Sequence, residues 1–265
     1  MKTFLKILFL ILWIAIAAGA VVLMGFSNKL HKEKPCIGMH ITTDYSGSDP
    51  LFTNEGLKQS LESTFGKTEK KTLADIDLER MMRYLKMNPA IEQVDAYITV
   101  EGKLDIKVKQ CKPIARLIDR NGNEHYLDVK GKILPVDPRF PVRVMIANGS
   151  YVVTVPDGSS IFATGKKKHE DGNSLTLTHI HALSAFITHD NVLCALIEQI
   201  SVKPDGMLQL ATKAGSHTIE FGDTNDMKSK FDNLKTFYRQ GLSKTGWDKY
   251  RTINLMYKNQ IVCTK

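Results

Sequence analysis

The sequence predicts an α+β protein with a single N-terminal transmembrane helix, a small β-α-α-β-β domain, and a larger mixed β-rich domain with flanking helices. Three observations support this prediction. An apolar run fills residues 4–26, two helical patterns precede an alternating hairpin within residues 36–112, and short strand patterns separated by turn residues dominate residues 113–265. Two helices on a three-stranded sheet form a complete small α+β unit, so we expect two folded domains after the membrane segment.

The apolar N-terminal run predicts a membrane anchor. Residues 4–26 carry one charge, at Lys6, and about 1.5 Å of rise per residue gives a helix of roughly 35 Å, enough to span a hydrocarbon core of about 30 Å. A cleaved signal peptide is the alternative, because small residues occur at "AIAAGA", but the run continues through Met24. We therefore expect an uncleaved anchor, with residues 1–3 in the cytoplasm and residues 27–35 as a linker.

The composition and charge of the chain argue against a nucleic-acid partner. The 265 residues are 43% hydrophobic and 24% charged, which is typical of folded domains. The net charge is +8, and residues 1–34, which flank the anchor, hold half of this excess. A basic membrane flank explains this charge better than a nucleic-acid surface, which would concentrate cations on a folded domain.

The first domain begins with a strand and two helices. Residues 36–43 ("CIGMHITT") alternate between apolar and polar types, and a helix is predicted from its candidate N-cap Thr53 to Gly66. A second helix is predicted to start near Asp75 and to end before Pro89. The residues predicted to face the core are Ile37, Met39, Ile41, Leu57, Leu61, Phe65, Leu78, Met81, Met82 and Leu85.

A β-hairpin follows these helices, within residues 87–117. Apolar residues alternate with polar ones on both sides of Gly102, which gives one apolar and one polar face, as in a half-buried antiparallel pair. The predicted core residues are Val94, Ala96, Ile98, Val100, Leu104, Ile106 and Val108.

The second domain is predicted to contain short strands and two helices. One helix is expected at residues 179–189, after an exposed basic loop at 156–176, and another from Asp226 to Gly241. The last element is predicted to be one strand at residues 250–263. The other strand segments are 114–118, 125–128, 141–149, 196–203, 207–212 and 217–222.

No pattern for catalysis, metal binding or cofactor binding is found in the sequence. "GKT" at residues 66–68 lacks the first glycine of a phosphate-binding loop and ends a helix instead of following a strand. His179 and His181, with His189 and Cys194, could suggest a metal cluster, but residues two apart on a helix point in different directions. We therefore expect solvated or capping histidines, no cofactor and no enzyme activity.

The four cysteines are Cys36, Cys111, Cys194 and Cys263. They are widely spaced and form no C-x-x-C motif, which makes a redox or zinc site of that kind improbable. A pairing of Cys36 with Cys111 is conceivable because export permits disulfides. Free thiols are the preferred interpretation.

The order of segments resembles the bacterial division protein family FtsQ/DivIB. The resemblance rests on "NPAIEQVDAYITVEGKLDIKVKQCKPIARL", "HYLDVKGKILP", "IEQISVKPDGMLQLATKAGSHTIEFG", "LKTFYRQGL" and "YRTINLMYKNQIV". It covers nearly all the chain except residues 151–176, and the short N-terminus and "NQIV" ending look most like Bacteroidetes members. The resemblance implies a POTRA-like domain at 36–112 and an FtsQ-like β domain at 113–265.

The same resemblance implies a non-enzymatic scaffold of the bacterial division machinery. Such a protein sits in the inner membrane at the division septum, with its C-terminal domains in the periplasm. It would dock FtsB and FtsL and, through them, control the septal peptidoglycan synthase. The alternative is a POTRA-containing factor for membrane-protein assembly or secretion, although such proteins usually carry several tandem POTRA units.

The C-terminal strand is the predicted partner-binding site. Because it follows a helix, we expect it at a sheet edge, where unpaired N–H and C=O groups can bind a partner strand. The alternative is an internal strand that buries its side chains. The predicted partner-binding residues are Tyr250, Ile253, Asn254, Leu255 and Tyr257.

Overall fold

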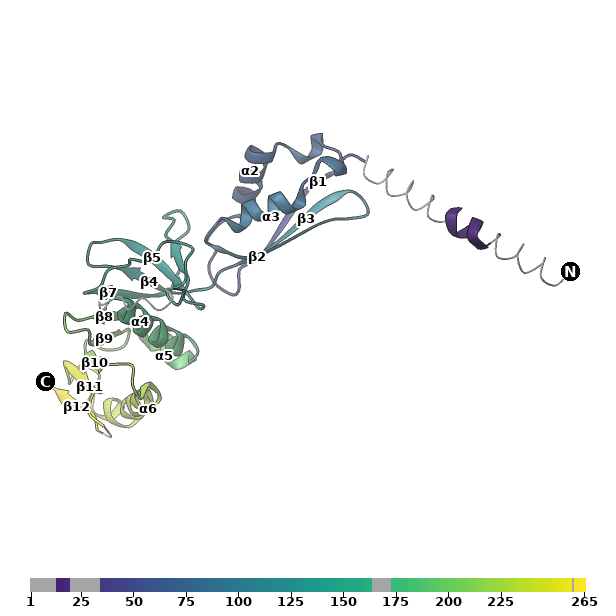
Figure 1. Ribbon diagram of the computed structural model, residues 1–265. Coiled ribbons are helices and arrows are strands. Elements are labelled where there is room, and N and C mark those ends of the chain that lie inside the picture. The colour runs from purple at the N-terminus through teal and green to yellow at the C-terminus, as the bar shows by residue number, and fades with distance from the viewer. Residues whose placement is uncertain (1–12, 20–33, 164–172, 259) are drawn as a thin grey trace. The chain divides into compact units, whose positions relative to one another are not determined.

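The computed structural model describes residues 13–19, 34–163, 173–258 and 260–265. The chain forms two compact units (Figure 1). Unit 1 consists of the residues up to Thr43, Thr53–Met87 and Gln93–Val108, and unit 2 consists of Asp44–Phe52, Asn88–Glu92 and Lys109–Lys265.

The N-terminal region is described only in part. Residues 13–19 are helical, and the rest of the predicted anchor at 4–26 lies outside the described residues, as does most of the predicted linker. No helix within the described ranges has the length and apolar character needed to cross a membrane.

The small sheet has three strands in the order β1-β3-β2. The strands are β1 (Gly38–Asp44), β2 (Ile91–Ile98) and β3 (Lys103–Gln110), and the helices are α2 (Asn54–Phe65), α3 (Leu78–Lys86) and two short 3₁₀ turns, η1 (Thr68–Lys70) and η2 (Leu73–Asp75). The predicted β-α-α-β-β order and the hairpin between β2 and β3 are confirmed.

Local side chains set the ends of these helices. The Thr53 hydroxyl accepts a hydrogen bond from the Gly56 N–H at 3.0 Å, and Gly66 ends α2 with a φ of 79°. The second helix has its N-cap at Asp77, close to the predicted position near Asp75. Asp75 instead forms a capping box with Thr72 that closes η2, and Asp77 caps α3. Two acidic residues two positions apart both suit a helix start, and the sequence pattern did not separate them.

The core of the small sheet confirms most of the predicted positions and corrects two. Leu104, Ile106 and Val108 are all buried. Ile37 and Val100 were predicted to face the core, but they are 59% and 81% exposed. Both lie outside the strands, where alternation no longer fixes the side to which a side chain points.

The large sheet in unit 2 has nine strands in the order β12-β11-β10-β9-β8-β7-β4-β5-β6. The pairs β4–β7, β7–β8 and β10–β11 are parallel, and the other pairs are antiparallel. The strands are β4 (Pro113–Ile118), β5 (Glu124–Asp128), β6 (Ile133–Pro135), β7 (Met145–Gly149), β8 (Ile197–Val202), β9 (Leu208–Thr212), β10 (Thr218–Gly222), β11 (Thr252–Asn254) and β12 (Val262–Thr264).

Helices of unit 2 pack with the large sheet in a single core cluster. They are α4 (Asn173–Thr188), α5 (Asn191–Leu196), α6 (Met227–Phe237), a π-helical turn η3 (Tyr238–Leu242) and α7 (Ser243–Thr245). Two predicted bounds are wrong. The helix predicted at 179–189 begins at Asn173, and the helix predicted to end at Gly241 continues as η3 and α7 up to Gly246, whose φ is 93°. A glycine inside a helix need not end it when buried neighbours hold the turn, and here Tyr238 and Leu242 are buried on either side.

The four cysteines lie within the described residues and are free thiols. Cys36 and Cys111 are buried, Cys194 is exposed and Cys263 is half-buried. Burial raises the pKa of the Cys111 thiol to about 11, which keeps it protonated and unreactive at neutral pH. The free-thiol interpretation is confirmed.

Candidate functional site: the C-terminal edge of the large sheet

The C-terminal segment forms two short strands, not the single strand predicted at residues 250–263. β11 lies between β10, to which it is parallel, and β12, to which it is antiparallel. The prediction that residues 250–257 form the sheet edge is therefore wrong, and β12 is the terminal strand of the sheet on that side. β12 runs antiparallel to β11, which places Cys263 opposite Ile253.

The structure divides the five predicted partner-binding residues into two groups. Ile253 is fully buried and Leu255 is 3% exposed, and both belong to the core cluster. Asn254 is half-buried, and its Oδ1 accepts a hydrogen bond from the Met256 N–H at 2.9 Å.

The remaining two predicted residues are aromatic and accessible. Tyr257 is 51% exposed. Tyr250 is half-buried, with its ring centroid 6.1 Å from that of Phe237 and the Lys249 ammonium 5.6 Å above the ring. The Tyr257 ring is therefore accessible at the surface, whereas Tyr250 is partly packed against the core cluster.

Three further apolar side chains at this end of the sheet are exposed and were missed in the sequence. Met256 is 46% exposed, Val262 is 41% exposed and Trp247 is 40% exposed. A tryptophan outside every predicted helix and strand was the available signal for Trp247. Trp247 lies near Gly215, before β10, whereas Met256 lies near Gly222 at the other end of that strand, so these exposed side chains are spread along this end of the sheet.

A groove runs beside the terminal strand. It has a volume of about 410 Å³ and is lined by Asn233, Thr236, Phe237, Gln240, Gly241, Gln260 and Ile261. Gly241 lets the Phe237 ring lie against the helix backbone, because a Cβ at this position would lie only 2.8 Å from Cδ2 of Phe237. If another chain added a strand next to β12, its side chains on the core side of the sheet could enter this groove.

A buried ring cluster supports the connection between η3 and β11. The Tyr238 hydroxyl lies 2.5 Å from His217 Nε2, and the Trp247 ring packs edge-on against Tyr238 at 5.4 Å. Burial lowers the pKa of His217, with the backbone carbonyl of Trp247 and the charge of Asp248 acting in the opposite direction. The cluster thus connects the residue just before β10, the helical segment and the chain that leads to β11.

The face of the sheet opposite the core is polar and regular. One row of directly paired residues crosses six strands: Val262, Asn254, Glu220, Gln209, Ser201 and Asn148. Gln209 Nε2 donates to Glu220 Oε1 at 2.5 Å, and Ser201 Oγ donates to Asn148 Oδ1 at 2.9 Å. A strand added to β12 would therefore continue a polar row on one face and the core row on the other.

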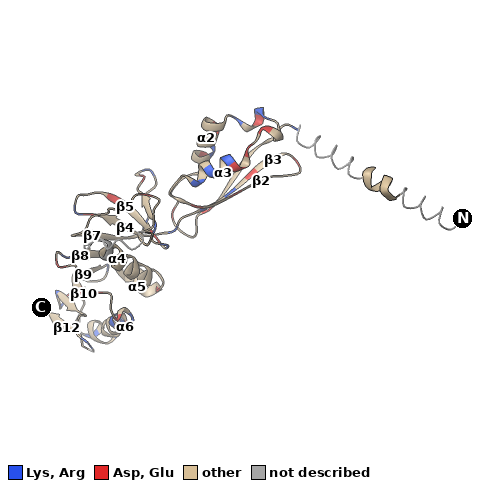
Figure 2. Ribbon diagram, viewed as in Figure 1, with Lys and Arg blue, Asp and Glu red and all other residues tan. Residues whose placement is uncertain are grey.

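The C-terminal edge is also basic. Residues 243–265 hold five cations and a single acid, Asp248, so they account for half of the net charge of +8. The cations are Lys244, Lys249, Arg251, Lys258 and Lys265, drawn in blue with the other basic residues in Figure 2. The segment therefore carries a net positive charge.

Metal ligands do not gather at this site. Across the part of the chain that the structure describes, no three His, Cys, Asp or Glu side chains are placed to hold a metal ion. The accessible groups are backbone amides, tyrosines, apolar side chains and lysines, which suit the binding of another chain.

The fold and the site define a class of two-unit protein: a three-stranded, two-helix unit followed by a nine-stranded mixed sheet with an available terminal strand. The POTRA-like domain family matches residues 34–109, and the FtsQ/DivIB, C-terminal related family matches residues 112–264. The second match covers more than half of the chain, which therefore belongs to the FtsQ/DivIB C-terminal-related family. No individual curated protein matches the chain significantly. The matches name no bacterial group, so the expected Bacteroidetes origin is not supported.

Proposed function

We propose that this protein is a non-enzymatic scaffold of the bacterial division machinery. Residues 4–26 anchor it in the inner membrane, and its C-terminal domains act in the periplasm at the septum. There they dock FtsB- and FtsL-like proteins and so control septal peptidoglycan synthesis. Membership of the FtsQ/DivIB-related family supports the division role, and the terminal position of β12 with the exposed side chains of Tyr257 and Val262 supports the docking role.

Docking proceeds by addition of a partner strand to β12. The partner gains main-chain hydrogen bonds from the open side of β12, and its alternate side chains point to the two faces of the sheet. On the core side they reach the groove formed by Phe237, Gly241 and Ile261, and on the other side they lie beside Val262. Tyr250 and Tyr257 then anchor the flanking part of the partner.

Charge selects and orients the partner segment. Because the C-terminal edge carries a net charge of +4 over residues 243–265, an acidic segment is attracted and a basic one repelled. Complementary charge mainly raises the association rate and lowers it again at high salt. We therefore expect the docking segment of the partner to be acidic.

The side-chain part of the proposal is tested by binding of an FtsB/FtsL-like complex to the full-length protein in detergent. Tyr257→Ala should weaken binding about tenfold, which corresponds to about 1.4 kcal/mol. Tyr97→Ala is the matched control, because Tyr97 is 43% exposed on β2 in the other unit. Normal binding of folded Tyr257→Ala and Tyr250→Ala would contradict the anchoring role.

The backbone part is tested with proline. N–H groups of adjacent strand residues point to opposite sides, so only one of Val262→Pro and Cys263→Pro removes a donor from the open side of β12. That variant should keep the thermal stability of the protein and lose binding, whereas the other should disturb the pairing with β11. Retention of partner binding by both proline variants would exclude strand addition at β12.

The second candidate function is membrane-protein assembly or secretion, which the POTRA-like match at residues 34–109 also permits. A single POTRA-like match followed by an FtsQ/DivIB-related match favours division. Affinity purification of the anchored protein from dividing cells separates the two, because it should recover division proteins instead of β-barrel assembly or secretion components.

A further inference from the structure

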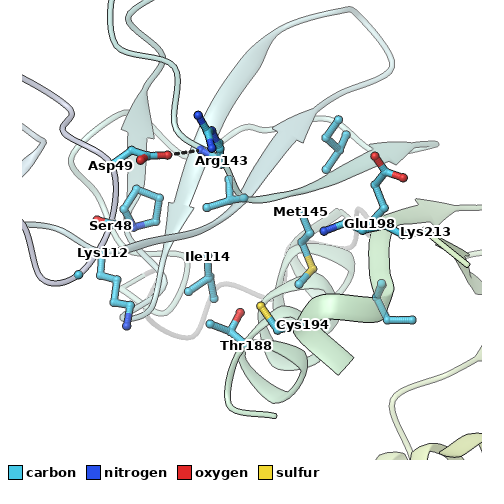
Figure 3. Close-up of a pocket in the computed structure, with 15 residues that line it drawn as sticks. Ser48, Asp49, Lys112, Ile114, Arg143, Met145, Thr188, Cys194, Glu198 and Lys213 are labelled. Carbon is cyan, nitrogen blue, oxygen red and sulfur yellow. Dashed lines mark hydrogen bonds between the residues drawn. The ribbon is translucent and has the colours of Figure 1, made fainter. Parts of the chain in front are cut away.

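Unit 2 contains a second hollow, distant from β12 in the sheet. It has a volume of about 730 Å³, which is within the range of ligand-binding sites. Figure 3 shows Lys112 and Lys213 on opposite sides of it, with Ile114, Met145 and Cys194 between them. We name this hollow the Lys112–Lys213 cleft.

The floor of the cleft is apolar and its rim is basic. Ile114 and Ile197 are buried beneath it. Lys112, Arg143 and Lys213 on the rim are exposed, and the side chain of none of them takes part in an ion pair with the described residues.

Two carboxylates also line the cleft. Asp49 is already engaged, because its Oδ2 accepts a hydrogen bond from the backbone N–H of Arg143 at 3.0 Å, the dashed line in Figure 3. Glu198 is exposed on the rim. Three cations therefore face two acids, and a ligand that brings carboxylates to the cations completes the pairing.

One wall of the cleft is held in place by a buried glutamine. Gln110 is fully buried. Its Nε2 donates to Ser48 Oγ at 3.2 Å and to the Asp49 carbonyl at 3.1 Å, and its Oε1 accepts from the Leu51 N–H at 2.6 Å. The segment that contributes Ser48 and Asp49 is thus fixed by three hydrogen bonds from one side chain, so the cleft exists before a ligand arrives.

We propose that the Lys112–Lys213 cleft binds an acidic peptide segment of a partner protein. Carboxylates of the segment pair with Lys112, Arg143 and Lys213, and an aliphatic side chain between them covers Ile114 and Met145. A free phosphate would engage the cations and leave the apolar floor in water, whereas an acidic and aliphatic segment satisfies both. This site is independent of the docking proposed at β12.

The cleft and the terminal strand can be occupied at the same time. β8, which contributes Ile197 to the cleft, is separated from β12 by β9, β10 and β11 in the sheet. Four strand spacings of about 4.8 Å place the two sites roughly 19 Å apart. The domain therefore offers two separate surfaces to two segments of one partner or to two partners.

Cys194 provides a footprint of binding in the cleft. It is the exposed cysteine and lies in the cleft, whereas Cys36 and Cys111 are buried. In a Cys263→Ser background of the full-length protein in detergent, maleimide labelling therefore reports on Cys194. The probe is the peptide Asp-Leu-Glu-Ile-Asp-Leu, and its controls are Asn-Leu-Gln-Ile-Asn-Leu and Lys-Leu-Lys-Ile-Lys-Leu.

The acidic peptide should slow the labelling of Cys194, and the neutral and basic peptides should not. Lys112→Glu combined with Lys213→Glu should weaken binding of the acidic peptide at least about fivefold, measured by fluorescence anisotropy. Lys70→Glu combined with Lys103→Glu changes the net charge equally at exposed positions of the other unit and should leave binding unchanged.

Several results would overturn the proposal. The proposal fails if the acidic peptide binds the wild type and the Lys112/Lys213 double variant with equal affinity. It also fails if saturating peptide does not slow the maleimide labelling of Cys194. Displacement of the peptide by inorganic phosphate at equal concentration would make the cleft a simple anion site. If the wild type binds phosphatidylglycerol vesicles and the Lys112/Lys213 double variant does not, the cleft binds lipid headgroups instead of a peptide.

Discussion

Replacing Ile253 by alanine tests which residues of the C-terminal segment belong to the core. Ile253 is fully buried, lies opposite Ile219 of β10 and Cys263 of β12, and belongs to the core cluster. Its truncation removes buried methyl groups and leaves a cavity between strands that cannot collapse freely. Such a change typically destabilises a protein by about 2 to 5 kcal/mol.

The expected shift in melting temperature follows from this free energy. For a domain of this size, each kcal/mol lowers the midpoint by about 2 to 4 °C, so Ile253→Ala should lower it by roughly 6 to 12 °C at about 3 kcal/mol. Ile253→Val, which keeps most of the side chain, should cost about 1 kcal/mol. Both are measured by calorimetry of the purified protein.

Tyr257→Ala provides the contrast, because Tyr257 is 51% exposed. A surface substitution of this kind should change stability by about 0.5 kcal/mol or less. If Ile253→Ala melts like the wild type while Tyr257→Ala is strongly destabilised, the division of this segment into core and surface residues is wrong, and with it the position of β12 at the sheet edge.

Three further predictions concern stability. Gly149→Ala should destabilise the protein by more than about 2 kcal/mol in urea unfolding, because φ is +120° and the added Cβ would lie 2.1 Å from the backbone oxygen of Val202. The control is Gly122→Ala, at φ +81° with nothing near its Cβ, which should cost about 1 kcal/mol. Equal effects of the two substitutions would contradict the close approach of Gly149 to Val202. Gln110→Leu removes three hydrogen bonds and leaves the buried Leu51 N–H without its acceptor, so it should cost about 1 to 3 kcal/mol in the same assay. An unchanged midpoint would mean that this side chain does not hold the loop. Burial lowers the pKa of His217 in the folded protein, so the unfolded chain takes up the proton first as the pH falls. The contribution of neutral His217 to the free energy of unfolding is therefore complete above about pH 6.5 and is lost below it. His217→Gln should flatten the fall in melting temperature between pH 7 and 5, and an unchanged slope would show that His217 does not titrate in this range.

Helix ends and the hairpin were predictable because local chemistry decides them. Thr53 and Gly66 bound α2 through contacts within the same turn, and the alternation around Gly102 fixed the two faces of the hairpin. The sequence pattern was weaker where two local signals competed. Asp75 and Asp77 both suit a helix start, and packing around η3 overrode the glycine at position 241.

The partner-binding role of the C-terminal segment stays a prediction, and its position in the sheet differs from the one expected. The C-terminal segment does lie at one end of the large sheet, and Tyr250 and Tyr257 are accessible there. Trp247 and Val262 were missed because exposure of an apolar side chain depends on which neighbours cover it. The Lys112–Lys213 cleft could not be predicted either, since Lys112 and Lys213 are far apart in the chain.

The sequence by itself determined the order of strands and helices in the first unit, the apolar faces of most of them and the likeness to a division-protein family. Only the tertiary structure decided that β11 is internal and that β12 ends the sheet. The physical reason is that strand order depends on backbone pairing between distant segments: Ile253 pairs with Ile219 on one side and with Cys263 on the other. Alternation shows that one face of a strand is buried, but it contains no information about which neighbour occupies each edge.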